Sequence, residues 1–405
     1  MSAGNENSRI ADLNRSYMDK TVLTFTGDIG FDHFMAGKWE DENLIADDVL
    51  AYLAASDHVI ANVEGPLVDP SSAKLMQAAE MRLMHTIDPA AVSVLHRMNA
   101  DIWNLCNNHI MDAGQEGLAL TLECAKENGA AALGVGMNLD EACRPVYLDE
   151  AGGIGMFAVG YRRGCKPAGP DKGGCLNWNE TDTIRSIISE IKSKCRWCIV
   201  VSHGGEEFTA LPTPYTRDRY LEYLDLGADA VICHHPHVPM NYEKVGDKYI
   251  FYSLGNFIFD TPYQRSQFYT ESGVVLKLIF AEDRYDFEAL GVRVDRDAER
   301  IASAPLPDIF TEVPEDEYKK LAPLSAKAFV AATKRQQIFM YPDRYSAATT
   351  EEEWHENFWN EKRSGRVPGE ALDFQIVCPL ADEAEKGAWK DSRLEKVKDY
   401  ILKMM

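Results

Sequence analysis

The sequence predicts an α/β protein, and three observations support this prediction. Short apolar runs alternate along the chain with amphipathic segments, which is the pattern of strands and helices that follow one another. The chain has 405 residues, of which 45% are hydrophobic and 26% charged, so it can bury a large core. The last strands follow one another without helices between them, so the C-terminal part of the sheet is expected to be mixed or antiparallel.

Eight short apolar runs have the length of buried strands. They cover residues 21–27, 58–63, 101–106, 153–160, 197–203, 228–234, 248–255 and 273–280. Four amphipathic segments between them are predicted as helices, at residues 88–99, 115–129, 180–194 and 216–227. Asn128-Gly129 and Gly227 are natural C-terminal stops for two of these helices.

The character of the chain changes after residue 297, which divides it into a main domain, 20–297, and a mostly helical C-terminal extension, 298–405. The extension has helical segments at 315–337 and 391–405, separated by a polar section with an aromatic cluster at 351–363. It carries no cluster of ligand-like residues. We therefore expect it to act as a cap or as a contact between subunits of a homo-oligomer.

Charge limits the partners of this protein. It has 42 basic and 64 acidic residues, a formal charge of −22, which disfavours nucleic acid and anionic membrane surfaces. A small-molecule or oligomeric anionic substrate would therefore need a bound cation. The N-terminus lacks the basic and apolar regions of a secretory signal, and no apolar run is long enough to span a membrane. The sequence thus predicts a cytoplasmic protein without a membrane anchor.

The cysteines do not indicate a disulfide framework. There are nine of them, an odd number scattered through predicted strands and helices, as expected of reduced thiols. The one CxxC motif, Cys195 to Cys198, has no second pair to complete a zinc site and is interpreted as structural.

Polar residues able to bind metal follow five of the predicted strands. Ligands gather at the carboxyl ends of strands in open α/β sheets, so these residues are expected to share one site. They are Asp28, Glu64, Asn107, Asn108, His109, His203, His234, His235 and His237. Each alone has a structural explanation: a turn at Asp28, a helix cap at Asn108, or a loop hydrogen bond from one histidine beside Pro236. Their coincidence on five loops favours a metal site.

The donor set indicates which metals fit. Two carboxylates, an amide oxygen and three imidazoles without a thiolate suit Mn, Zn, Fe(II) or Co rather than Ca or a structural zinc. A carboxylate can bridge two cations about 3.5–4 Å apart in a hydrolytic centre. Glu64 is the best placed residue for that role. The expected cofactors are one or two divalent transition-metal ions.

At this point the order of motifs resembles the CapA/PgsA family, named for poly-γ-glutamate capsule biosynthesis, within the calcineurin-like metallophosphatase superfamily. The resemblance covers roughly residues 20–282 and implies a four-layer αββα sandwich of the metallophosphatase type. The motifs are Gly-Asp (27–28), Asn-x-Glu (62–64), Asn-Asn-His-x-x-Asp-x-Gly (107–114), His-Gly-Gly-x-Glu-Phe (203–208), His-His-Pro-His-Val (234–238) and Tyr-Ser-Leu-Gly-Asn-Phe (252–257).

The resemblance also implies roles for individual residues. Asp28 and His237 would bind one metal, Asn108, His203 and His235 the other, and Glu64 would lie between them where the superfamily usually has aspartate. His109 would be the general acid. Residues expected to orient the ligands are Asn62, Asp112, Glu207 and Asn256. The superfamily commonly has a histidine where this chain has Gly30, so Asp32 or His33 is expected to substitute.

Three classes of function follow. The first is a metal-dependent hydrolase, in which a metal-activated water attacks a phosphoester or an amide bond such as a γ-glutamyl linkage. The second is a CapA-like polymer-binding or scaffold protein in capsule biosynthesis, without hydrolytic turnover. The third is a protein whose metal only stabilises the fold. His109 beside the predicted ligand Asn108 favours the hydrolase, because neither other class needs an acid there.

Overall fold

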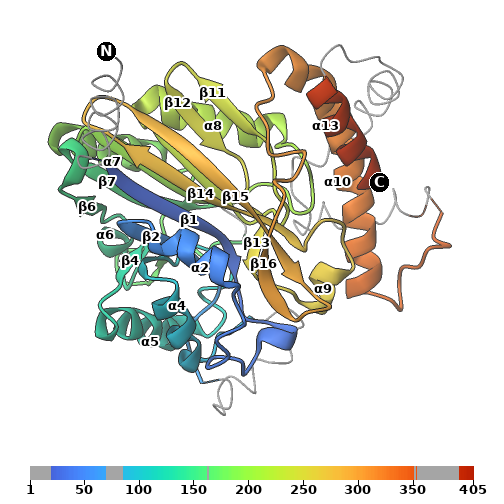
Figure 1. Ribbon diagram of the computed structural model, residues 1–405, viewed down its shortest axis with the longest axis horizontal. Helices are drawn as coiled ribbons and strands as arrows, with labels where there is room; N and C mark the ends of the chain where they lie inside the picture. The colour runs from blue at the N-terminus through green and yellow to red at the C-terminus, as the bar shows by residue number, and fades with distance from the viewer. Residues whose placement is uncertain (1–19, 70–84, 162–163, 351–352, 354–391) are drawn as a thin grey trace, which may run out of the picture.

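Two β-sheets packed face to face form the centre of the molecule (Figure 1). The computed structural model describes residues 20–69, 85–161, 164–350, 353 and 392–405. The first sheet has the order β16-β15-β14-β1-β2-β3-β4, with β13 paired to β1, and the second has the order β11-β12-β10-β9-β7-β6. β5 and β8 form a further, two-stranded sheet.

The strands of the first sheet are β1 (Thr21–Ile29), β2 (His58–Val63), β3 (Ala100–Asn104), β4 (Ala131–Leu133), β13 (Asn256–Ile258), β14 (Ser272–Phe280), β15 (Tyr285–Asp295) and β16 (Arg300–Ala304). Those of the second are β6 (Val146–Leu148), β7 (Ile154–Gly160), β9 (Trp197–His203), β10 (Ala230–His234), β11 (Tyr242–Val245) and β12 (Lys248–Phe251). The small sheet pairs β5 (Val135–Gly136) with β8 (Gly174–Cys175).

Alternating side chains of the second sheet build two separate cores. On β9, Ile199 and Val201 face the first sheet, whereas Cys198 and Val200 face the helices on the outer side. All of them are fully buried, because a strand covered on both faces has no solvent side. This is why β9, WCIVVSH, is a nearly continuous apolar run.

Helices cover the outer face of each sheet. Those after β1, β2 and β3 pack on the first sheet: η1 (His33–Met35), α2 (Asp47–Ala54), η2 (Pro89–Ala91), α4 (Val92–Arg97) and α5 (Gly114–Glu127). The second sheet is covered by α7 (Thr181–Lys194) and α8 (Pro214–Leu226). The remaining helices are α6 (Leu139–Ala142), η3 (Glu150–Gly152), α9 (Pro262–Arg265), α10 (Glu315–Met340) and α13 (Ser392–Lys403).

Local sequence explains how α8 begins and ends. Thr213 is its N-cap and accepts a hydrogen bond from the backbone N–H of Thr216, with Pro214 at the first helical position. Gly227 ends it with a φ of 119°, a left-handed conformation that glycine adopts without a steric penalty.

The layer order confirms the predicted four-layer αββα sandwich. All eight predicted strands and all six predicted helical segments are present, although some ends differ by a few residues. The antiparallel pairing of β14 with β1 and β15 confirms the mixed C-terminal sheet. Several further elements were not predicted from the sequence, among them α2, β15 and β16. Residues 300–304, assigned to the extension, instead form β16, which pairs with β15 across the predicted division at 297.

The C-terminal extension packs against the loops that follow β9 and β10. The helices α10 and α13 lie side by side at one side of the sandwich (Figure 1). A separate apolar cluster joins Leu321 and Leu324 of α10 and Val397 of α13 to Phe208 and Val238. The section 351–363 lies outside the described residues, apart from Glu353. Within the described ranges, no helix is both long enough and apolar enough to span a membrane.

Candidate metal centre

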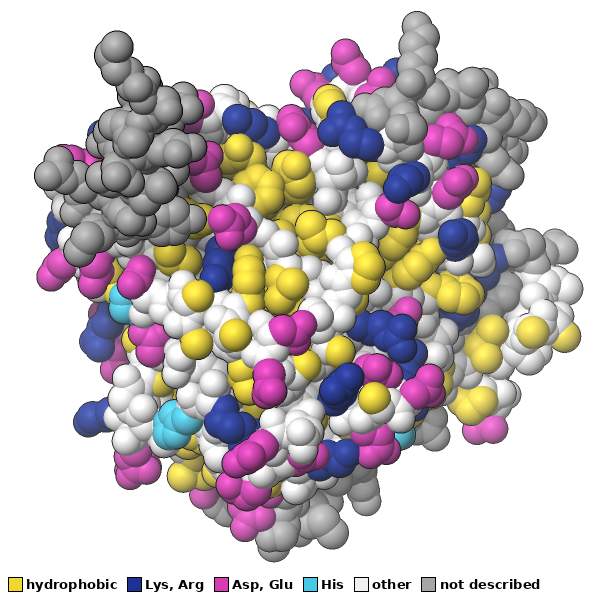
Figure 2. Space-filling view, in the orientation of Figure 1, with side chains coloured by type: hydrophobic (Ala, Val, Ile, Leu, Met, Phe, Trp, Pro, Cys, Tyr) yellow, Lys and Arg dark blue, Asp and Glu magenta, His cyan; other side chains and the backbone are white. Residues whose placement is uncertain are grey.

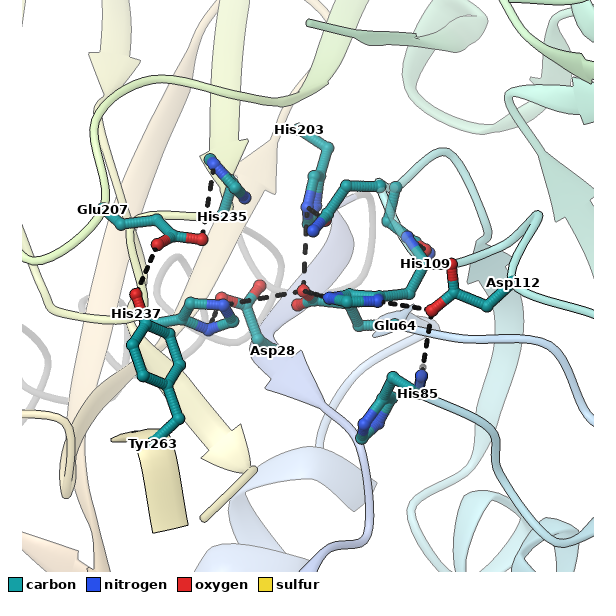
Figure 3. A network of polar contacts seen from close by, with 12 residues as sticks. Asp28, Glu64, His85, His109, Asp112, His203, Glu207, His235, His237 and Tyr263 are labelled. Carbon is teal, nitrogen blue, oxygen red and sulfur yellow. Dashed lines mark hydrogen bonds and ion pairs between the residues drawn. The ribbon is translucent and has the colours of Figure 1, made fainter. Parts of the chain in front are cut away.

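The predicted ligands meet because the strands that precede them run parallel. β1 and β2 place Asp28 opposite Asn62, and β9 and β10 place His203 opposite His234. The carboxyl ends of these strands lie at the same edge of the sandwich in both sheets, and side chains from both sheets converge there (Figure 3).

Glu64 is at the centre of this cluster. It is fully buried, and neither carboxylate oxygen has a hydrogen-bond partner in the described part of the chain. Its Oε1 lies 3.6 Å from Nε2 of His237, 3.8 Å from Nε2 of His203 and 4.0 Å from Nε2 of His109. Burial raises the pKa of Glu64 well above its usual value. A buried carboxylate without hydrogen bonds is costly unless a cation satisfies it.

Two groups of side chains at Glu64 have the spacing of metal ligands. One is Asp28, Glu64 and His237, and the other is Glu64, His203 and His235; in each, the ligand atoms lie within 4.8 Å of one another. Glu64 belongs to both groups. The donors are carboxylate oxygens and imidazole nitrogens, so the set fits divalent transition metals. The structure thus brings together the residues predicted to hold two cations, with Glu64 shared between them.

Asn108 lies at the second of these groups. Its Oδ1 is 2.6 Å from Nε2 of His203, the same nitrogen that faces Glu64. Burial, together with the neighbouring His235, lowers the pKa of His203 well below its usual value. Burial also lowers the pKa of His235. Both imidazoles are therefore neutral, which is the form that binds metal.

The first group is held by a chain of amides. Asn62 donates from Nδ2 to Asp28 Oδ1 at 2.8 Å, and Asn104 donates from Nδ2 to Asn62 Oδ1 at 2.6 Å. On the other side, Nδ1 of His237 lies 3.1 Å from Asp28 Oδ2 and 3.0 Å from Asn256 Oδ1. Asn62 and Asn256 were expected as supports, whereas Asn104 was not. Strand alternation could have indicated Asn104, which pairs with Asn62 across β2 and β3.

His237 differs from the other buried histidines. Burial opposes its charge, but the carboxylates of Glu64 and Asp28 outweigh that effect and raise its pKa to about 10. Its neighbour His234 points elsewhere, with Nε2 2.9 Å from the carbonyl oxygen of Thr26. Of the three histidines in 234–237, two therefore face the centre and one bonds the adjoining sheet.

His109 lies beside the centre rather than within the two groups. Its Nδ1 is 2.7 Å from Oδ2 of Asp112, and its Nε2 is turned toward Glu64. The same Asp112 oxygen accepts the backbone N–H of His85 at 2.9 Å. The side chain of His109 is 20% exposed, so a substrate can reach it.

There is no room for a side chain at Gly30. A Cβ there would lie 2.6 Å from Nε2 of His85 and 2.7 Å from Oδ2 of Asp32. Asp32 pairs with Nδ1 of His85 at 3.3 Å, and His33 lies 3.2 Å from a guanidinium nitrogen of Arg265. Neither Asp32 nor His33 belongs to a ligand group among the described residues. His85, which no sequence motif singled out, occupies this space.

Glu207 forms a third group with His235 and His237, again with ligand atoms within 4.8 Å of one another. The sequence predicted Glu207 as a support. The structure instead brings its carboxylate to the histidines themselves, with Oε1 4.0 Å from Nε2 of His235.

Fold and site together define an α/β sandwich with a buried nitrogen and oxygen centre at the ends of its strands. The profile of the family described as "Bacterial capsule synthesis protein PGA_cap" matches residues 22–261. The chain belongs to this family, as the motif order predicted. The matched range includes all of Asp28, Glu64, Asn108, His109, His203, His235 and His237.

Two curated relatives are similar to part of this chain. The "PGA biosynthesis protein CapA" of Bacillus subtilis is 29% identical over 272 residues, covering 62% of this chain and 67% of that protein. The "Capsule biosynthesis protein CapA" of Bacillus anthracis is 28% identical over 272 residues, covering 64% of each chain. The similarity thus spans about two thirds of each relative's length.

Among solved structures, the crystal structure of TT1561 of Thermus thermophilus is similar with a TM-score of 0.35 and 9% identity, covering 66% of this chain and 98% of that one.

Proposed function

We propose that this protein is a metal-dependent hydrolase that cleaves a phosphoester or an amide bond of the γ-glutamyl type. The observation that carries the proposal is Glu64, a fully buried carboxylate with no hydrogen-bond partner in the described structure, surrounded by imidazoles at ligand spacing. Such a group is stable when it binds cations. Bound divalent cations supply Lewis-acid activation of water and of the scissile group.

The chain's own residues divide the remaining work. Asp28, Glu64 and His237 would hold one cation, and Asn108, His203 and His235 the other, together with Glu64. Asn62 and Asn256 fix the orientation of Asp28 and His237 through the contacts described above.

His109 is the proton donor in this proposal. Its Nδ1 is engaged by Asp112, so the proton available to a leaving group is the one on Nε2. Nε2 faces the cluster, and the ring is partly exposed, which places the donor between the centre and solvent. A scaffold role without turnover explains neither the His109–Asp112 pair nor the orientation of Nε2 of His109 toward Glu64. A purely structural metal does not explain them either.

An anionic substrate fits this arrangement. The chain carries a net charge of −22, and on the face that Figure 2 shows, described acidic and basic side chains are interspersed. Attraction for a phosphate or carboxylate therefore has to come from cations in the centre. The curated relatives are named for the biosynthesis of PGA and capsule. A γ-glutamyl amide is for that reason one of the two bond types proposed.

The test is a side-by-side activity screen of the Mn- or Zn-loaded protein against phosphomonoesters, phosphodiesters and γ-glutamyl amides. We expect turnover of one class that a chelator abolishes and added metal restores. Specific binding of poly-γ-glutamate by the loaded protein, with no cleavage of any substrate in the panel, would support the scaffold alternative instead.

A further inference from the structure

Gln336 of the C-terminal extension reaches the metal centre. Gln336 of α10 donates from Nε2 to Glu207 Oε2 at 3.2 Å. Tyr263 of α9 donates from its hydroxyl to the same oxygen at 3.0 Å. Both donors engage Oε2, so Oε1 is the oxygen turned toward the histidines (Figure 3), 4.0 Å from Nε2 of His235.

Glu207 lies against both cation positions. It forms a ligand group with His235 and His237. His237 also belongs to the group that contains Asp28, and His235 also belongs to the group that contains His203. Figure 3 shows Glu207 on one side of these two histidines and Glu64 on the other. Glu207 can therefore complement Glu64 from the opposite side of the centre.

Both the number of ligands and the charge of the centre favour Glu207 as a further ligand. The group of Asp28, Glu64 and His237 has three residues, and the space at Gly30, where a further ligand would originate, is filled by His85 and Asp32. Two divalent cations carry four positive charges, of which Asp28 and Glu64 offset two. A third carboxylate brings the charge closer to balance in a buried site, where uncompensated charge is costly.

We propose that Glu207 is a third carboxylate ligand of the metal centre and that Gln336 of the C-terminal extension positions it. This inference rests on the proposed metal centre and adds to it a residue from a segment that the family profile, which ends at residue 261, does not cover. The extension is then part of the centre and not only a cap.

Packing explains why Gln336 can hold Glu207 in a fixed place. Phe208, the next residue, is buried in the apolar cluster with Leu324 of α10. Ser325 on the same helix donates to the carbonyl of Leu211, at 3.2 Å, and accepts the backbone N–H of that residue at 3.1 Å. The loop that carries Glu207 is thus fixed to α10 along its length.

The contact between α9 and α10 fixes the other donor. The ring of Tyr263 packs on that of Phe339, with centroids 5.6 Å apart. Arg335 donates from Nε to Gln267 Oε1 at 3.0 Å, which joins α10 to the segment after α9. Both donors to Glu207 are therefore held by the docked extension.

The test uses the full-length protein, stripped of metal and titrated with Co²⁺. The variants are Glu207→Gln, Gln336→Ala and the double variant. Glu206→Gln is the matched control, because Glu206 is the adjacent glutamate of the same loop and its carboxylate is directed to Thr213 and Thr216. Three quantities are measured: the Co²⁺ dissociation constants, the visible absorption of bound Co²⁺, and the melting temperature of the metal-free protein.

We expect Glu207→Gln to weaken at least one Co²⁺ site by about 10- to 100-fold and to change the Co²⁺ spectrum, as loss of a ligand does. Gln336→Ala should weaken the same site by about tenfold, and the double variant should match Glu207→Gln, because Gln336 acts through Glu207. Glu206→Gln should keep the wild-type affinity and spectrum.

Wild-type affinity and spectrum in Glu207→Gln would exclude Glu207 as a ligand. Additive losses in the double variant would exclude the positioning role of Gln336. If Glu207→Gln does not fold, Gln336→Ala, at a partly exposed position, still has to shift the Co²⁺ spectrum for the inference to stand. Absence of Co²⁺ binding by the wild-type protein would instead overturn the proposed function itself, and this inference with it.

Discussion

His109 and Asp112 form a hydrogen-bonded pair, with Nδ1 of the histidine 2.7 Å from Oδ2 of the aspartate. The aspartate oxygen also accepts the backbone N–H of His85, so its position is fixed from a second side. A carboxylate on one ring nitrogen fixes both the tautomer and the orientation of an imidazole. Nε2 of His109 is thereby directed toward Glu64, at 4.0 Å.

Replacing His109 should separate catalysis from metal binding. General acid catalysis contributes about 10²- to 10⁴-fold, so His109→Ala should lose turnover by that factor on a substrate with a poor leaving group. Bound metal and melting temperature should change little, because His109 is in neither ligand group and is partly exposed. Rate, metal stoichiometry and melting temperature are measured on the same preparation.

His235→Ala is the contrasting variant, since it removes a predicted ligand. It should lose metal and activity together, and its imidazole is fully buried, so stability should fall as well. A folded, metal-loaded His109→Ala protein with an undiminished rate would remove His109 from the mechanism.

Metal affinity should rise with pH. In the metal-free protein the pKa of Glu64 is raised by burial, and the pKa of His237 is raised to about 10 by the nearby carboxylates. The centre therefore holds a proton at neutral pH, on the imidazole of His237, that a cation has to displace. Affinity should increase by about tenfold per pH unit for each displaced proton below the raised pKa values.

Competition with a chromophoric chelator at pH 6, 7 and 8 measures this dependence, and calorimetry in buffers of different ionisation enthalpy counts the protons released. His109→Ala serves as the control, because His109 is not a predicted ligand and its loss should leave the slope unchanged. A flat affinity across this range would show that the metal-free centre holds no protons for a cation to displace.

Much of the fold and the convergence of the candidate site residues could be predicted from the sequence, because parallel strands carry these residues at a fixed position. The run before His203 is apolar at nearly every position, as expected of a strand that is buried on both faces. The carboxyl end of such a strand lies at the edge of the sheet where ligands bind. β15 and β16 were not predicted. β15 alternates between buried and more exposed positions over its first residues, and β16 has five residues of which only Ile301 is buried, so neither has an apolar run of strand length.

Other residues around the candidate site could not be predicted in the same way. Which glutamate of Glu206-Glu207 faces the histidines depends on the loop, where Gly205 and Phe208 adopt φ values of 113° and 57° that interrupt strand alternation. His85 is distant in sequence from every motif and reaches Gly30 only through the tertiary fold. Gln336 lies on a helix whose docking has no local sequence signal.

The buried ion pair between Arg217 and Glu243 should be important for stability. Nε and Nη2 of Arg217 donate to the two oxygens of Glu243, at 2.9 and 2.6 Å, and Tyr252 donates to the same carboxylate at 2.7 Å. Glu243→Ala leaves a buried guanidinium without its partner, which should lower the free energy of unfolding by about 3–5 kcal/mol. Chemical denaturation of the metal-free protein measures it.

The exposed pair Arg185–Asp182 is the control for that experiment, and Asp182→Ala should leave the denaturation curve unchanged. The ring of Tyr318 on α10 packs on the Arg217 guanidinium. Glu243→Ala should therefore also weaken the packing of the C-terminal extension against the domain. Equal stability of Glu243→Ala and the wild type would show that water or another side chain compensates the arginine.

The two ligand groups should bind cations with different affinities. The group of Glu64, His203 and His235 has Asn108 beside it as a fourth ligand. Because Gly30 offers no side chain, the group of Asp28, Glu64 and His237 depends on the proposed contribution of Glu207. The protein should therefore hold one cation firmly and a second loosely.

Asp28→Asn should remove the weaker step of a Zn²⁺ titration and keep the stronger one, because Asp28 is only in the incomplete group. His203→Ala should remove the stronger step. Elemental analysis before and after gel filtration distinguishes the two occupancies. Two equally tight sites would contradict the assignment, and absence of any transition metal after reconstitution would exclude the centre altogether.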